Sequence, residues 1–176
     1  MSRAIVIGMH ATLDTRTADE LATRPGFVEA YALRRLGDGR RLTLALWTAA
    51  DDPTAYTIEE DVAAFDAGSP AGAVATAYFD PPISRARQAA ARFGFRERIQ
   101  PALAAVPGLV RMLVLGRDGA NCVVTITVDL PSLETTAAAI SGTQLLPGED
   151  PALLTGPDRV DVHTVTHHTT SAGVHR

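Results

Sequence analysis

The sequence predicts an α+β fold made of two related halves that share one core. Two observations support this prediction. A hairpin pattern occurs twice, with a Pro-Gly start, an apolar run, an Asp-Gly turn and a second apolar run. Pro-Gly recurs 82 positions apart, at residues 25 and 107, and Asp-Gly recurs 80 positions apart, at residues 38 and 118. We interpret this shared spacing as an internal duplication.

The composition is that of an ordinary globular protein and excludes several functional classes. The chain has 176 residues, of which 46% are hydrophobic and 20% charged, so it suits one domain or two half-size repeats. A net charge of -4 offers no basic surface for nucleic acid. All sixteen basic residues are arginine, so no lysine is available for Schiff-base catalysis.

Cysteine content and hydropathy exclude further classes. Cys122 is the sole cysteine, which rules out a disulfide within the chain and a cysteine-based zinc site. No apolar stretch approaches the roughly 20 residues needed to span a bilayer. Residues 1–7 contain one arginine and a short β-branched run that Gly8 interrupts, which predicts a first strand and not a signal peptide. We expect a cytoplasmic protein that binds no membrane.

The first half, residues 1–70, alternates strand-like and helix-like segments. Thr17 caps a short helix, and glycine at 37 and 39 supplies the positive φ of a hairpin turn. Ile58, Val62 and Phe65 form one apolar stripe, which predicts a helix that follows the hairpin. The predicted strands are residues 4–10, 27–36 and 41–48, and the predicted helices are residues 17–23 and 54–66.

The second half, residues 71–176, repeats this order and adds a final strand. Ser84 caps a long helix that we expect to be irregular at Gly94 and Pro101. Residues 141–158 are rich in proline and glycine and predict a long loop, which in compact domains is often a lid or a linker. The predicted strands are residues 74–79, 109–115, 121–128 and 160–167, and the predicted helices are residues 84–105 and 133–140.

Each half then has the order of a ferredoxin-like split βαβ unit. A sheet with helices on one face leaves its other face apolar and in need of cover. Two copies in one chain supply this cover face to face. The predicted fold class is therefore α+β, with two ferredoxin-like split βαβ repeats packed as an α+β barrel.

The hairpin motifs carry a family resemblance. The first half has Pro-Gly-Phe at residues 25–27, Gly-Asp-Gly at 37–39 and Leu-Trp at 46–47. The second half has Arg-Ile-Gln-Pro-Ala-Leu at residues 98–103, Pro-Gly-Leu at 107–109 and Asp-Gly at 118–119. With these motifs the sequence resembles the dimeric α+β barrel superfamily, and it is most similar to the antibiotic biosynthesis monooxygenase branch.

The resemblance implies a pocket, inside the barrel or between sheet and helices, for a small aromatic or polyketide-like ligand. Some members oxidise phenols to quinones with O2 and no metal or flavin, whereas others isomerise, cyclise, bind haem or have no known activity. The Asn-Trp-His set of the haem-degrading branch is missing at matching positions, so we expect no cofactor. Duplication lets one chain build what others build as a dimer, and a homodimer remains open.

Aromatic residues are the first candidates for such a pocket. Trp47 is the sole tryptophan, and it either stacks on an aromatic ligand or fills the core. Tyr31 lies in a predicted strand and either shapes the same pocket or bonds to the backbone.

His10 and Tyr78 are the candidates for proton transfer. His10 ends the first predicted strand, and histidine is the usual general base near neutral pH. Tyr78 offers a phenol within the strand at 74–79. His163 and His167 are roughly 13 Å apart along a strand, too far to share an ion, so no metal site is expected.

Polar residues on the hairpin strands complete the candidate set. Asn121 and Thr125 share one strand face, which either lines a wet pocket or faces solvent. Glu29 and Arg111 occupy equivalent positions, because 29 plus 82 is 111. They pair across a pseudo-twofold axis, bind polar groups of a ligand, or carry surface charge on a sheet edge.

The sequence therefore predicts a cofactor-independent, monooxygenase-like enzyme for a small aromatic or polyketide-derived compound. Its catalytic candidates are His10 and Tyr78. Its substrate-binding candidates are Trp47, Tyr31, Asn121, Thr125 and Arg111. Two alternatives remain: a cyclase or isomerase that uses acid-base groups on the same fold, and a non-catalytic binding or interaction protein.

Overall fold

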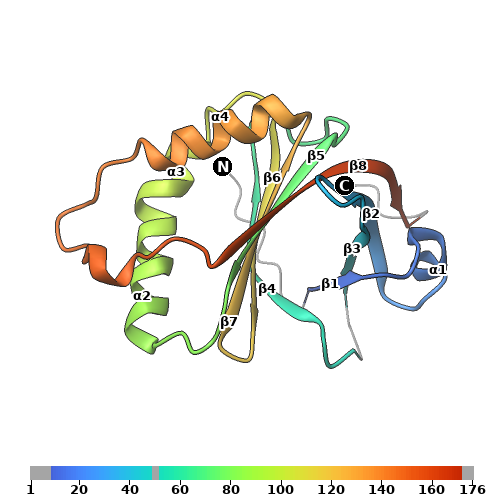
Figure 1. The fold of residues 1–176 in the computed structure, drawn as a ribbon, viewed down its shortest axis with the longest axis horizontal. Helices are drawn as coiled ribbons and strands as arrows, with labels where there is room; N and C mark the ends of the chain where they lie inside the picture. Colours follow the sequence, from blue (N-terminus) through green and yellow to red (C-terminus); the bar gives the residue numbers. More distant parts are fainter. Residues whose placement is uncertain (1–8, 49–51, 172–176) are drawn as a thin grey trace.

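The computed structural model describes residues 9–48 and 52–171, whose strands form a closed, eight-stranded antiparallel barrel. Figure 1 shows helix α1 on one side of this barrel and helices α2, α3 and α4 on the opposite side. The strands are β1 (His10–Asp14), β2 (Phe27–Arg35), β3 (Arg41–Trp47), β4 (Tyr56–Ala63), β5 (Ala73–Phe79), β6 (Leu109–Arg117), β7 (Ala120–Thr127) and β8 (Arg159–Thr170). This barrel, together with the helices packed on it, confirms the predicted α+β class.

The strand order explains how the barrel closes. It runs β1-β3-β2-β8-β5-β7-β6-β4, and β4 pairs back with β1. The last strand of each predicted half joins the other half, since β4 pairs with β6 and β8 pairs with β2. Closure in this way leaves no sheet edge for edge-to-edge association. The boundary at residue 70 remains a prediction.

The helices lie on the outer face of the barrel. They are α1 (Ala18–Ala22), α2 (Arg85–Gly94), α3 (Gln100–Leu103) and α4 (Leu130–Ser141), with a π-helical turn at Phe95–Ile99 and a 3-10 turn at Pro151–Leu153. Thr17 and Ser84 cap α1 and α2 as predicted. The expected irregularity of the long helix is confirmed, because the π turn begins directly after Gly94 and α3 begins beside Pro101.

The helix predicted at residues 54–66 is wrong, because this segment forms β4. A bulge between Ile58 and Glu60 changes the alternation, so that Ile58 packs in the barrel interior whereas Val62 packs on the outer side. Phe65, the third member of the supposed stripe, lies beyond the strand and is 66% exposed. Pairing with β6 and β1 removes two open sheet edges, and this tertiary effect outweighs a weak helical pattern.

The first strand also differs from its prediction. Residues 4–8 of that prediction lie outside the described residues, and the described strand β1 begins at His10 and continues to Asp14. No helix in the described ranges 9–48 and 52–171 combines the length and apolar character that crossing a membrane requires.

Period-2 alternation along the strands creates an interior core and two outer clusters. On β3, Leu44 and Leu46 face the interior, whereas Ala45 and Trp47 face outward beneath α1. The interior core includes Leu33, Val74, Leu113, Leu115, Val124 and Ile126. The outer cluster beneath the other helices contains Phe95, Leu103, Val106, Leu109 and Met112.

Candidate functional site

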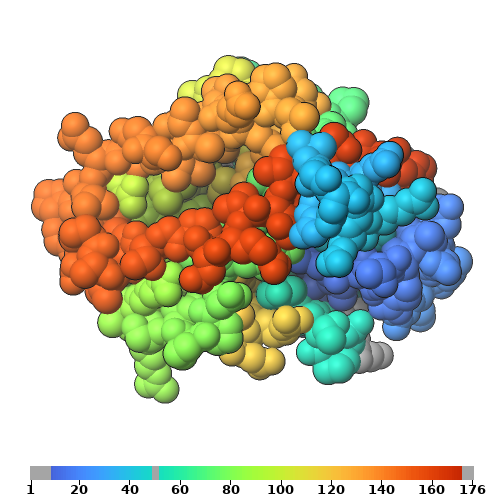
Figure 2. All heavy atoms as spheres, viewed as in Figure 1, coloured from blue at the N-terminus to red at the C-terminus, as the bar shows by residue number. Residues whose placement is uncertain are grey.

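An apolar cavity of about 320 Å³ lies between the outer face of the barrel and the helices of the second half. We call it the sheet–helix pocket. Figure 2 shows the surface hollowed between α4 and the segment that leads into β8. Its lining includes Glu59, Glu60, Phe79, Arg87, Gln88, Ala91, Arg92, Phe95, Arg98, Ile99, Val114, Asn121, Val123, Ile140, Leu153 and Leu154. A mostly apolar concave site of this size is typical of small-molecule binding.

The apolar walls come from three elements. Val114 and Val123 pair across β6 and β7, and both point outward because the neighbouring Leu113 and Val124 point into the barrel. The π turn after α2 contributes part of the opposite wall, including Ile99. Local sequence therefore directs these side chains into the pocket through strand alternation and helix irregularity.

Two polar groups converge at one end of the pocket. Asn121 lies on the outer face of β7 and pairs in register with Gly116 on β6. The Glu59 carboxylate occupies the space over Gly116, where a Cβ atom would overlap it. Adjacent strands are about 4.8 Å apart, so the amide and the carboxylate flank the same glycine. Arg92 pairs with Glu59 at 3.1 Å.

The loop at 141–158 covers this pocket. Leu153 and Leu154 line it, and the loop is tied to the helices through Glu149. Glu149 accepts a hydrogen bond from the Leu146 amide at 2.6 Å and one from Arg98 at 2.9 Å. The hydrogen bond from the Leu146 amide has the largest effect and lowers the pKa of Glu149, and Arg98 lowers it further.

In the first half, the space between the outer face of the barrel and α1 is filled by side chains. Trp47 is 4% exposed beneath α1, and its Nε1 donates a hydrogen bond to Thr12 at 3.0 Å. Phe27 meets the indole edge to face at a centroid distance of 5.7 Å. Trp47 does not line the sheet–helix pocket, and its position is that of a core aromatic.

A network of charged and polar side chains lies inside the barrel. Of the alternatives considered for Glu29 and Arg111, the structure shows the pairing, because the Arg111 guanidinium donates to Glu29. The same guanidinium makes two hydrogen bonds to Asp61, at 2.7 and 2.6 Å. Tyr31 donates to Glu29 at 3.0 Å and stacks on His168 at 4.3 Å between centroids. Arg111 and Tyr31 are thus occupied by protein partners.

Burial alone would raise the pKa of Glu29, but His168, Arg111 and Tyr31 outweigh it and lower the pKa to about 2. Burial and the neighbouring Glu29 raise the pKa of Tyr31. Asp61 escaped sequence reasoning because its segment resembled a helix. The network is held inside the barrel by strands β2, β4, β6 and β8.

The remaining predicted residues are dispersed. Tyr78 lies at one mouth of the barrel, where it lines a second cavity. His10 alternates with the interior residue Ala11 and therefore faces outward, on the opposite side of the barrel wall from Tyr78. Thr125 shares the outer face of β7 with Asn121 but lines none of the described cavities. Of the predicted set, only Asn121 borders the sheet–helix pocket.

Other chemical classes find little support within residues 9–48 and 52–171. In this part of the chain no three His, Cys, Asp or Glu side chains lie close enough to hold a metal ion. Burial raises the pKa of the Cys122 thiol to about 12, so it stays protonated in the core.

Solved structures share this architecture. An anthrone oxidase-like protein aligns over 93% of this chain and 92% of its own, with 12% identity and a TM-score of 0.57. A ferredoxin-fold protein from Listeria monocytogenes, related to antibiotic biosynthesis monooxygenases, aligns over 90% and 95%, with 12% identity and a TM-score of 0.55. The chain shares the α+β barrel fold of these proteins. A heme-degrading enzyme from Listeria monocytogenes also has this fold, at 9% identity, a TM-score of 0.55 and coverage of 89% and 99%.

Each of these matches covers most of this chain and most of the matched chain. No family model and no curated protein sequence matches the chain. At such low identities the likeness shows the fold alone, and activity has to be argued from the pockets.

Proposed function

We propose that the protein is a monooxygenase-like enzyme that binds a small aromatic or polyketide-derived molecule in the sheet–helix pocket and oxidises it with O2. One observation is central to this proposal. An apolar cavity of about 320 Å³ ends in a carboxylate, Glu59, beside an amide, Asn121. Apolar walls favour a flat hydrocarbon body, and the polar end suits an oxygen substituent on it.

The proposed chemistry uses only this polar end. Glu59 accepts a proton from an activated CH2 group beside a phenolic ring, and Asn121 donates a hydrogen bond to the oxygen that gains negative charge. The electron-rich carbanion then reacts with O2. The carbon loses two hydrogens and gains one carbonyl oxygen, and the second oxygen leaves with those hydrogens as water. The four electrons lost by carbon reduce O2.

The experiment measures oxygen uptake with a panel of hydroxylated anthrones and naphthols. The anthrone oxidase-like structural match supports this choice of first substrates. We expect uptake by the wild type and a loss of about 100-fold in Glu59→Gln, in the range found for removal of a general base. Glu60→Gln is the matched control, because Glu60 also lines the pocket and pairs with Arg96, and it should retain activity within about threefold. Equal losses in both variants would contradict the assignment.

Non-catalytic binding is the second candidate. The observation that favours it is the ion pair between Glu59 and Arg92 at 3.1 Å, which gives the carboxylate a partner within the protein. Calorimetry separates the two functions: saturable binding of the panel without oxygen uptake or product formation would support the binding protein. Product formation without oxygen uptake would support the cyclase or isomerase.

A further inference from the structure

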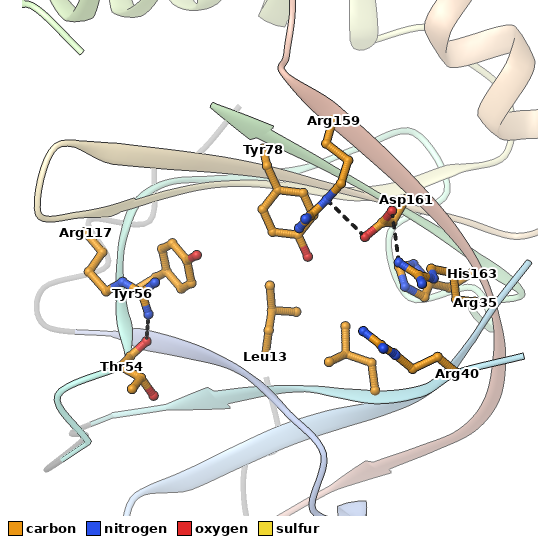
Figure 3. A pocket seen from close by; sticks show the side chains of 11 residues that line it. Leu13, Arg35, Arg40, Thr54, Tyr56, Tyr78, Arg117, Arg159, Asp161 and His163 are labelled. Atoms are coloured by element: carbon orange, nitrogen blue, oxygen red, sulfur yellow. Dashed lines mark hydrogen bonds and ion pairs between the residues drawn. The ribbon is translucent and has the colours of Figure 1, made fainter. Parts of the chain in front are cut away.

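A second cavity, of about 270 Å³, opens at one mouth of the barrel. We call it the barrel-mouth pocket, and Figure 3 shows its side chains around a central space. Its lining is formed by Leu13, Arg35, Arg40, Leu42, Thr54, Tyr56, Tyr78, Arg117, Arg159, Asp161 and His163. It lies inside the barrel wall, whereas the sheet–helix pocket lies outside it.

Antiparallel topology gathers these residues. Arg35 and Arg117 end β2 and β6, whereas Arg159 begins β8, so alternating strand ends bring all three to the same mouth. Seven of the eight strands contribute a lining residue, and only β7 does not. A site built from so many rigid strands is a preorganised feature of the barrel.

Positive charge exceeds negative charge around this pocket. Four arginines line it, against one lining carboxylate, Asp161, which lies 3.4 Å from both Arg35 and Arg159. Arg35 also pairs with Asp38 outside the lining. Arg40 and Arg117 form no ion pair with any side chain in the described ranges. Four guanidinium groups against two carboxylates leave an excess of two positive charges.

Two of the guanidinium groups lie over tyrosine rings. Arg117 lies 4.3 Å from the ring centroid of Tyr56, and Arg159 lies 4.2 Å from that of Tyr78. Stacking fixes a guanidinium face while its edge N–H groups remain able to donate to a planar or tetrahedral oxyanion. Both tyrosine hydroxyls point toward the centre of the cavity (Figure 3).

His163 adds an independent observation. It is only 1% exposed, it lines the same cavity, and its Nδ1 has no hydrogen-bond partner within the described part of the chain. A buried polar atom without a partner is rare and costly, so His163 is a polar feature of the cavity wall that apolar packing does not explain. Burial lowers the pKa of His163, the backbone of Val74 beside the ring only partly opposes this, and the ring is therefore neutral.

The opposite mouth lacks these properties. There, among the described residues, the single guanidinium of Arg111 pairs with two carboxylates, Glu29 and Asp61, so the charge of this pair is on the carboxylate side. Among the described residues, the barrel therefore has one mouth where carboxylates outnumber the arginine they pair with, and one mouth with surplus cationic donors.

We propose that the barrel-mouth pocket binds a small organic anion, with a carboxylate or phosphate group on a compact apolar body. The arginines and His163 receive the oxyanion, while Leu13, Leu42 and the tyrosine rings contact the apolar body. A volume of 270 Å³ exceeds that of a bare ion, since one water occupies about 30 Å³ of liquid.

Calorimetric titration with benzoate, phenyl phosphate and inorganic phosphate tests this proposal and separates carboxylate from phosphate recognition. We expect saturable, salt-sensitive binding of at least one aromatic anion, tighter than that of inorganic phosphate. Arg117→Gln should weaken binding by about tenfold or more. Arg41→Gln is the charge-matched control, because Arg41 is exposed on β3 and does not line the pocket. It should change affinity by less than about twofold.

His163 supplies a second readout if an arginine variant folds poorly. In histidine-selective NMR of the wild type, we expect the ligand to shift the His163 ring signals while the His10 signals stay in place. Absence of binding at millimolar ligand, or equal losses in Arg117→Gln and Arg41→Gln, would overturn the proposal. Ala91→Trp, which blocks the sheet–helix pocket, should leave this binding unchanged, so the two sites can fail separately.

Discussion

The two outer faces of the barrel are packed differently. Beneath α1, Trp47 fills the space between sheet and helix and is only 4% exposed. At the corresponding position of the second hairpin stands Thr127, a smaller residue whose hydroxyl donates to the Asp129 carbonyl at 2.7 Å. The face beneath α2 and α4 keeps a cavity of about 320 Å³.

Trp47 therefore acts as a core aromatic of the first face, and the cavity of the second face lies away from the equivalent Thr127, beside Asn121 and Val123. A buried indole contributes a large apolar surface and needs one hydrogen-bond partner, which Thr12 provides. The first half thereby gains stability, and the second half keeps room for a ligand. Changes that open the first face or fill the second are therefore the informative ones.

The largest stability effect should come from opening the first face. Trp47→Ala removes a buried indole and leaves a cavity, so we expect a loss of about 3–5 kcal/mol in the free energy of unfolding, measured by urea denaturation. Trp47→Phe keeps most of the volume and should lose less. A loss below about 1 kcal/mol for Trp47→Ala would show that this face is not the closed one.

The ion network that links the halves should give the next effect, through pH. Because the pKa of Glu29 is lowered from 4.5 to about 2, its ionised form is stabilised in the folded state. That contribution is fully present above about pH 4.5 and is lost as the pH falls toward 2. It amounts to about 3 kcal/mol at most.

Glu29→Gln should flatten the dependence of unfolding free energy on pH in this window, measured by urea denaturation at each pH. Arg111, His168, Tyr31 and, through Arg111, Asp61 face this carboxyl group and are unchanged in the variant. An equally steep acid dependence in Glu29→Gln would assign the effect to other carboxylates.

A smaller effect tests the hydrogen bond that holds Trp47. Thr12→Val leaves the buried indole N–H without its partner and should cost about 1–2 kcal/mol in unfolding free energy. Thr125→Val is the control, on the outer face of a strand in the other half, and we expect a change within about 0.5 kcal/mol. Similar losses of unfolding free energy in Thr12→Val and Thr125→Val would contradict a specific role of the Thr12 hydrogen bond.

The smallest effect should concern the loop over the second pocket. Glu149→Gln weakens the contact with Arg98, so we expect faster amide hydrogen exchange in residues 144–156 with little change in global stability. Unchanged exchange in this segment would show that the loop is held by its other contacts.

The parts of the molecule that were predictable depend on local patterns. Gly37 and Gly39 both have positive φ in the hairpin turn, and the spacing of 82 residues identified the Glu29–Arg111 pair. β4 was missed because the spacing of Ile58, Val62 and Phe65 fits a helical period, whereas in the structure a bulge between Ile58 and Glu60 shifts the strand alternation. Asp61 was missed with the strand. Long-range pairing with β6 decided the structure of that segment.

The candidate site was less predictable because its residues look like core residues. Val114, Val123 and Ile140 are apolar and periodic, and nothing local distinguishes a cavity wall from a packed interior. One signal was present, since Asn121 interrupts the outer face that contains Val123. The sole tryptophan drew attention to the first half, whereas the cavity depends on how helices from the second half pack on the sheet.

The most direct test of the central claim is calorimetric binding of the aromatic panel to Ala91→Trp and Ala89→Trp. Both alanines are exposed on α2, but only Ala91 lines the sheet–helix pocket. We predict that Ala91→Trp abolishes binding while Ala89→Trp binds as the wild type does. Undiminished binding to Ala91→Trp would contradict the sheet–helix pocket as the ligand site.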